Sequence, residues 1–112
     1  MIHALARRPE LFQRARENRS LVDRIIDETL RYESPVQCLN RVVTRTVELS
    51  GVTLQRDDLA RVFFGAANRD PLAFSDPDTF SIDRPPSEHV AFGQGIHYCL
   101  GAPLARLRPR SR

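Results

Sequence analysis

The sequence of 112 residues has only two cysteines, no tryptophan and no lysine, so that all 17 basic residues are arginines. Two cysteines are too few for a secreted disulfide framework, and they cannot supply the about four ligands that structural zinc and iron–sulfur sites use. No stretch approaches the roughly 18 consecutive apolar residues of a membrane-spanning helix. The sequence therefore predicts a cytoplasmic protein of a reducing compartment, with no membrane partner.

The charged residues give the chain a formal net charge of +3. Near its end, arginines alternate with other residues at Arg106, Arg108, Arg110 and Arg112, a pattern that can bind nucleic acid or acidic membranes. The basic residues are not interleaved with aromatic ones, as they are on many nucleic-acid-binding surfaces. We therefore expect no nucleic-acid partner. A basic binding module ranks behind the two interpretations of function given below.

One segment concentrates residues that carry chemistry: Phe92-Gly93-Gln94-Gly95-Ile96-His97-Tyr98-Cys99-Leu100-Gly101. A cysteine at a helix start favours its thiolate, because the oriented backbone amides stabilise the anion. Glycines permit sharp turns and let a flat macrocycle approach the backbone. A single thiolate in such a loop fits an axial haem ligand, and the alternative is an ordinary loop with a buried structural cysteine.

This segment resembles the haem-binding signature of the cytochrome P-450 family, in which a phenylalanine, two glycines, a basic residue, the ligand cysteine and a further glycine occur at this spacing. The resemblance implies that Cys99 is the metal ligand, on the proximal side of haem b (iron protoporphyrin IX). It also implies that Phe92 packs beside the thiolate and that His97 hydrogen-bonds a haem propionate. Gly95 and Gly101 would give the porphyrin room.

A second motif lies in a stretch with apolar residues at helical spacing, where we expect a helix over about 20–33 with Ser20 as its N-cap. Glu28 and Arg31 are neighbours on this helix and, taken alone, would form a surface ion pair contributing about 0.2–0.5 kcal/mol. The resemblance implies instead that Arg84 joins them from the segment before the haem loop. Such a buried Arg–Glu–Arg cluster has a desolvation cost but fixes a geometry.

Other segments follow the order of the family. Arg41 aligns with an arginine that pairs with a haem propionate, so that Arg41 and His97 would balance two carboxylates. Segments 66–71 and 74–80 match the bacterial branch of the family, although their Asn, Asp and Pro residues alone predict only turns. The resemblance extends from about Leu5 to Leu107.

The expected fold class is mainly α with a small β-sheet (α+β), the C-terminal portion of the cytochrome P-450 fold truncated at both ends. We expect a single partial domain over residues 1–112. Its parts would be helices at about 9–17 and 20–33, strands at about 37–64, a meander and haem-binding loop at 70–101, and a short helix at 100–107.

Within the strand region, 37–46 and 52–64 alternate enough to predict two strands, with a turn at Ser50-Gly51. Two features argue against regular pairing. Gln55-Arg56-Asp57 stands where the family has a Pro-x-Gly turn, and Arg61 places a charge among apolar neighbours. Cys38 is expected to be a half-buried strand residue that lines the pocket.

Members of the family are several times longer than this chain, and the resemblance places their distal oxygen-activating helix outside it. No catalytic residue of the distal side is therefore expected here. Pro109 would end the last helix early. A small chain buries a limited share of its surface, so we expect exposed apolar surface that the missing N-terminal part of the same enzyme would cover as a partner.

The resemblance implies an enzyme, a haem-thiolate monooxygenase that hydroxylates a small organic substrate with O2 and NAD(P)H. Electrons would come from a ferredoxin or flavodoxin that docks on a cationic surface. The alternative is a non-catalytic remnant or interaction module that lacks the oxygen-activating helix, since resemblance in fold does not guarantee function. For the isolated chain we favour this alternative.

Overall fold

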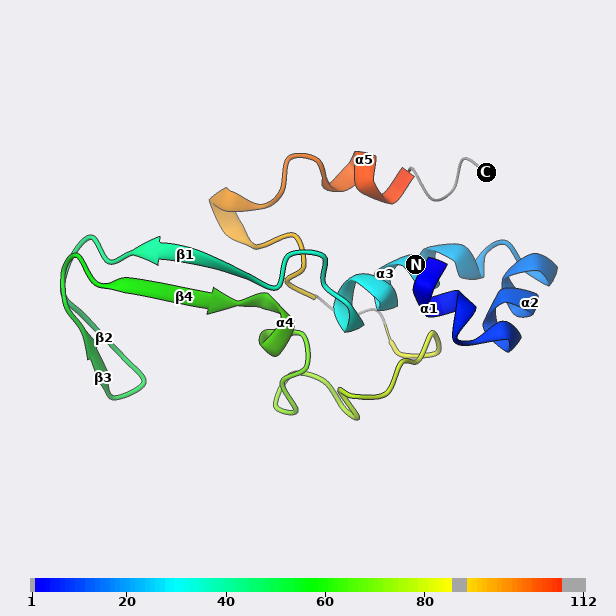
Figure 1. Ribbon diagram of the computed structural model, residues 1–112, viewed down its shortest axis with the longest axis horizontal. Coiled ribbons are helices and arrows are strands. Elements are labelled where there is room, and N and C mark those ends of the chain that lie inside the picture. The colour runs from blue at the N-terminus through cyan, green and yellow to red at the C-terminus, as the bar shows by residue number, and fades with distance from the viewer. Residues whose placement is uncertain (1, 86–88, 108–112) are drawn as a thin grey trace.

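The computed structural model describes residues 2–85 and 89–107, so that Pro109 and the last three arginines of the expected basic tail lie outside the described residues. The molecule is elongated, with extents of 54 × 29 × 21 Å. Antiparallel strands occupy one end, and helices α1, α2 and α3 occupy the other (Figure 1). The fold class is confirmed: helices are combined with a small antiparallel β structure.

The helical end is built from α1 (Ile2–Ala6), α2 (Pro9–Glu17) and α3 (Leu21–Tyr32). Proline occupies the first turn of α2, where its fixed φ suits a helix and its missing N–H has no intrahelical partner to lose. The helices pack around a core that also includes residues of the meander that follows the strands. Buried members of this core are Leu11, Ile25 and Ile82, with Leu5, Ala15, Leu21 and Phe80 packed against them.

The start of α3 differs from the expectation that Ser20 is its N-cap. Ser20 already has helical backbone angles, φ −66° and ψ −18°, and makes no capping bond with its side chain. Asn18 takes this part: its Oδ1 accepts hydrogen bonds from the Ser20 backbone N–H at 3.0 Å and from the Ser20 hydroxyl at 2.7 Å. Asparagine caps helices as well as serine does, so the capping side chain lies two residues before the expected one.

The strand region holds four short strands where the sequence predicted two longer ones. β1 (Cys38–Val42) pairs with β4 (Leu59–Phe63), and β2 (Val47–Leu49) pairs with β3 (Val52–Leu54), both antiparallel. The β2–β3 turn uses Ser50 and Gly51 at φ 50° and 78°. The extended conformation is interrupted between β3 and β4, because Asp57 adopts a left-handed φ of 72°. The Asp57 N–H donates to the Val43 carbonyl at 2.7 Å.

The expectation that Arg61 would disturb strand pairing is wrong. Arg61 lies opposite Asn40 in the β1–β4 register, and its Nε donates to Asn40 Oδ1 at 3.1 Å. Both side chains are on exposed strand residues, so the charge stays in solvent. A charge on an exposed face leaves the backbone ladder intact.

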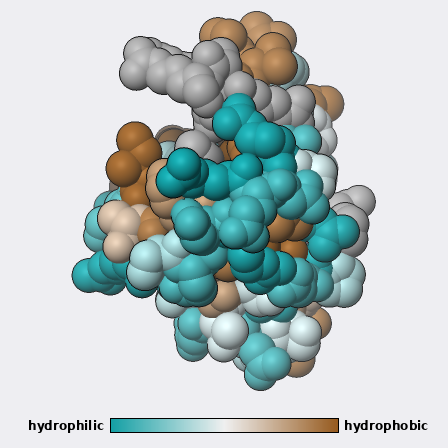
Figure 2. Space-filling model, turned by 90° about the vertical axis from the view of Figure 1, so that its right-hand side faces the viewer, coloured by the Kyte–Doolittle hydropathy of each residue, from teal (hydrophilic) through white to brown (hydrophobic). Residues whose placement is uncertain are grey.

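The strands expose apolar side chains that nothing in the described residues covers. The exposed members are Leu39, Val42, Val47, Leu49, Val52, Leu59, Val62 and Phe63. The opposite, helical end is mostly hydrophilic, with separate apolar patches at its edges (Figure 2). Among the described helices, none combines the length and apolar character needed to cross a bilayer.

Candidate functional site

A pocket of about 430 Å³ lies between the first strand pair and the loop that carries Cys99. This volume falls in the range typical of small-molecule and cofactor sites. One wall comes from the segment after α3 and from the strands and α4 (Phe64–Ala67): Pro35, Val36, Leu39, Arg41, Val62 and Phe64. The other comes from the loop: Ala91, Phe92, Gly93, Gln94, His97 and Cys99.

The Cys99 loop (residues 92–101) is folded by its own backbone hydrogen bonds. The Cys99 N–H donates to the Phe92 carbonyl at 2.8 Å, closing the loop around the short 3₁₀ helix η1 (Gly95–His97). Gly93 and Gly95 have φ of 71° and 63°, which other residues rarely adopt. At Gly93 a Cβ would also lie 3.4 Å from the His97 carbonyl oxygen. The thiol of Cys99 is free and exposed in this loop.

The structure brings four of the sequence-predicted site residues to one pocket: Arg41, Phe92, His97 and Cys99. Gly95 and Gly101 belong to the same loop, and at Gly101 a Cβ would be in ordinary contact with the Cys99 sulfur, at 3.9 Å. Cys38 is a half-buried strand residue at the start of β1, as expected, but the expectation that it lines the pocket is wrong. In a strand, neighbouring side chains point to opposite faces, and the adjacent Leu39 faces the pocket instead.

The chemistry of the pocket is defined by one thiol, two basic side chains and largely apolar walls. Within residues 2–85 and 89–107, no group of three His, Cys, Asp or Glu side chains could hold a metal ion by itself. The donor set therefore suits a largely apolar ligand that carries negative groups and a metal that accepts one sulfur ligand.

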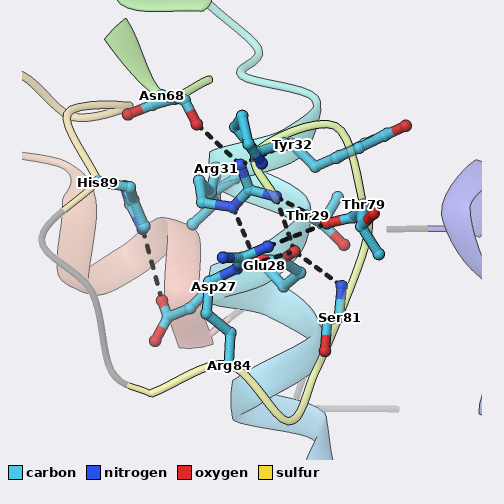
Figure 3. Close-up of polar contacts among 12 residues, drawn as sticks. Asp27, Glu28, Thr29, Arg31, Tyr32, Asn68, Thr79, Ser81, Arg84 and His89 are labelled. Carbon is cyan, nitrogen blue, oxygen red and sulfur yellow. Dashed lines mark hydrogen bonds and ion pairs between the residues drawn. The ribbon is translucent and has the colours of Figure 1, made fainter. Parts of the chain in front are cut away.

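Glu28, Arg31 and Arg84 form a buried cluster, named here the Glu28 cluster (Figure 3). Glu28 accepts two hydrogen bonds from Arg31, Nε to Oε2 and Nη2 to Oε1, each at 2.8 Å. Arg84 Nε lies 3.7 Å from Glu28 Oε1, and the Ser81 N–H donates to the same oxygen at 2.8 Å. The side chains of Glu28 and Arg31 are only 5% and 0% exposed, so this is not a surface ion pair.

Both arginines of the Glu28 cluster also bind backbone carbonyls of the meander. Arg31 donates to the carbonyls of Asn68 at 2.8 Å, Pro77 at 2.9 Å and Thr79 at 3.1 Å. Arg84 donates to the carbonyls of Ser75, Asp76 and Thr79. The cluster thereby fixes the path of the chain that leads toward the Cys99 loop.

Asn68 is a structural centre that the sequence motifs suggested only as part of a turn. It is fully buried, its Nδ2 donates to Ser34 Oγ at 2.7 Å, and its Oδ1 accepts from the Val90 N–H at 2.7 Å. Its own carbonyl accepts from Arg31. Asn68 thus connects the segment just after α3 to the segment at Val90, which leads into the pocket. An asparagine at a turn gives no signal for these distant partners.

A second polar group, unpredicted from the sequence, surrounds Asp27 on α3. Asp27 Oδ1 lies 3.8 Å from His89 Nε2 and 3.3 Å from Arg106 Nε of α5 (Ala102–Leu107). The sequence predicted this last helix from residue 100, two residues earlier than it begins. Burial lowers the pKa of His89 below its ordinary value of 6.5, and the Asp27 carboxylate offsets this only in part.

The free energy of unfolding is expected to fall as the pH drops through 6.5, the ordinary pKa of His89. Because its folded-state pKa is lowered, the unfolded chain binds a proton at His89 more readily than the folded chain does. Urea unfolding at about pH 7.5 and about pH 5.5 measures the loss. His89→Gln should reduce it, whereas His3→Gln, at an exposed histidine, should not. An undiminished loss in His89→Gln would contradict the assignment to His89.

Comparison with protein families gives one family for this chain: the family model described as Cytochrome P-450 matches residues 1–109. Among curated proteins, the chain is similar to the biotin biosynthesis cytochrome P-450 of Bacillus subtilis (strain 168), with 45% identity over 103 residues. That match covers 92% of this chain and 26% of the relative. The chain thus spans about a quarter of the length of the curated relatives it matches, as two further bacterial examples at 26% and 24% also show.

Solved structures give the same result. The chain is similar to CYP109E1 of Bacillus megaterium in complex with testosterone, with a TM-score of 0.93 and 44% identity over 97% of this chain and 30% of that one. It is also similar to P-450BioI in complex with an acyl carrier protein ligated to hexadec-9Z-enoic acid, with a TM-score of 0.93 and 42% identity. That match covers 97% of this chain and 29% of the other.

Proposed function

This chain belongs to the cytochrome P-450 family, and we propose that it is the haem-binding C-terminal part of a bacterial haem-thiolate monooxygenase. The single observation that carries the proposal is the pocket in which Cys99, Arg41 and His97 meet. Its donor set fits haem b: a soft sulfur ligand for the iron, two basic groups for two propionates, and apolar walls for the macrocycle. When bound, haem supplies the iron at which oxygen is activated.

Each pocket residue has a proposed part in holding the group. Cys99 would bind the iron as its thiolate, and the closed loop keeps the sulfur beside the pocket through the hydrogen bond from its own N–H to the Phe92 carbonyl. Arg41 and His97 would bind the propionates, because charge-assisted hydrogen bonds to carboxylates are stronger than neutral ones. Phe92 would exclude water from the sulfur side. We also propose a cytoplasmic location, since two free cysteines suit a reducing compartment.

The substrate and the electron donor belong to the whole enzyme and are proposed from the family. We propose a small organic substrate, since relatives are seen with testosterone and with a fatty acid on a carrier protein. A ferredoxin or flavodoxin would deliver electrons from NAD(P)H by docking on a cationic surface, where opposite charge favours encounter.

The exposed apolar strands support a second candidate function, an interaction module that associates with another polypeptide. Leu49, Val52 and Leu59 are 63%, 59% and 68% exposed, which is unusual for aliphatic side chains in a self-sufficient domain. The occupant of this surface would be the remaining part of the same enzyme. In this case the chain binds haem or its partner without turnover of its own.

Haem titration of the 112-residue chain tests the proposed function. The ferrous carbonyl complex is expected to show the red-shifted Soret band of thiolate ligation, and Cys99→Ser should abolish it because serine cannot supply the thiolate. Cys38→Ser is the matched control: it removes the other cysteine, which does not line the pocket, and should leave the band in place. A band that survives Cys99→Ser, or one that depends on Cys38, would overturn the ligand assignment.

A further inference from the structure

Arg106 makes three contacts that converge on the Cys99 loop from α5. Its Nε donates to Asp27 Oδ1 on α3 at 3.3 Å, and its Nη1 donates to the Tyr98 hydroxyl at 3.0 Å. Its guanidinium carbon also lies 4.9 Å from the centre of the Phe92 ring. One side chain therefore bridges helix α3 and two residues of the loop.

These contacts lie at the two ends of the hydrogen bond that closes the loop. Phe92 provides the carbonyl that accepts from the Cys99 N–H at 2.8 Å, and Tyr98 immediately precedes Cys99 in the chain. The Tyr98 and Phe92 rings also pack edge-on with their centres 6.4 Å apart. Displacement of Arg106 would therefore release both residues whose positions determine where the Cys99 backbone lies.

We propose that Arg106 is a positioning residue for Cys99, holding the Cys99 loop to α3 through Asp27, Tyr98 and Phe92. The relevance of this position to an iron ligand rests on the proposed function, whereas the positioning itself does not require haem. Asp27 is adjacent to Glu28, whose cluster anchors α3 to the meander. Arg106 thereby attaches the Cys99 loop to a helix that the Glu28 cluster already fixes to the meander.

A lysine could replace this arginine only in part. The planar guanidinium donates from separate nitrogens to Asp27 and Tyr98 while its face lies over the Phe92 ring, whereas an ammonium group is a compact point charge. Burial lowers the pKa of Arg106, but the hydrogen bonds that it donates to Tyr98 and Asp27 outweigh this effect, and the pKa is raised overall. The side chain stays cationic at any pH at which the protein is folded.

Hydrogen exchange of the full 112-residue chain without haem tests the proposal. The Cys99 amide should exchange about tenfold faster in Arg106→Ala, from the loss of one cation–π contact and two hydrogen bonds. Arg106→Lys should give an intermediate increase, and Tyr98→Phe, which removes only the hydroxyl, about threefold. The amide of Ile25 in α3 reports overall stability, and the proposal requires the Cys99 amide to accelerate more than the Ile25 amide.

Arg14→Ala is the matched control, because Arg14 forms an ion pair with Asp83 at the same 3.3 Å but does not touch the loop. It should leave Cys99 exchange within twofold of the parent. Equal acceleration of the Cys99 and Ile25 amides in Arg106→Ala and Tyr98→Phe, or none, would overturn the proposal. Haem titration separates the two claims: a parent chain that takes up no haem refutes the proposed function, while the exchange result still decides the part played by Arg106.

Discussion

Glu28→Gln is expected to lower the free energy of unfolding by about 3–5 kcal/mol. Glutamine keeps the shape of the side chain but removes the charge that compensates Arg31, whose side chain is fully buried, and Arg84 beside it. Glutamine also places its NH2 group, which can only donate, against an arginine, which can only donate as well. Urea unfolding followed by circular dichroism measures the change in midpoint and slope.

Glu48→Gln is the control, because it removes the same charge from the chain at an exposed residue of β2. Its effect should stay within about 0.5 kcal/mol. If Glu28→Gln proved as mild as Glu48→Gln, the Glu28 cluster would have to be open to water in solution, contrary to its burial in the structure.

Asn68→Ala is expected to lower the free energy of unfolding by about 2–4 kcal/mol. The change removes the side-chain partners of Ser34 Oγ and the Val90 N–H, both at 2.7 Å, and leaves a cavity in a fully buried site. Because Val90 leads directly into the pocket-lining residues Ala91 and Phe92, haem affinity should fall as well, by about tenfold. Denaturation and haem titration of the same sample measure the two effects.

Asn40→Ala is the control for this change. Asn40 is exposed on β1, and its side chain accepts one hydrogen bond from Arg61. We expect it to leave haem affinity unchanged and to reduce stability by less than about 1 kcal/mol. A wild-type haem affinity in Asn68→Ala would show that the segment at Val90 does not depend on Asn68 for its position.

The sequence predicted the family and fold class, because the segment from Phe92 to Gly101 is long and each of its positions is chemically distinctive. It placed Cys99, Arg41 and His97 in one site only through the resemblance, and their parts in binding haem stay predictions. The strand pairing was misjudged at Arg61 because a sequence does not show which face of a strand is solvated. The N-cap shifted to Asn18 because Asn18 and Ser20 are both good capping residues, and only their backbone angles distinguish them.

The polar centres that organise the site were the hardest features to predict. Glu28 and Arg31 could be paired from their spacing, but Asn68 and Arg106 act on partners that are distant in the sequence, Val90 and Asp27. A surface arginine and a turn asparagine look ordinary in any sequence. Their importance depends on which elements the complete fold brings beside them.

Arg31 and Arg84 donate to main-chain oxygens of the meander, at Asn68, Ser75, Asp76, Pro77 and Thr79. Every amino acid carries such an oxygen, so the acceptors survive a change of side chain at any of these positions. They do not survive an insertion or a deletion, which would move each carbonyl away from its guanidinium. Over evolutionary time, the side chains at 75–77 and at Thr79 are therefore free to change without loss of these bonds, whereas the length of the segment is not; Asn68 is the exception, because its side chain has partners of its own.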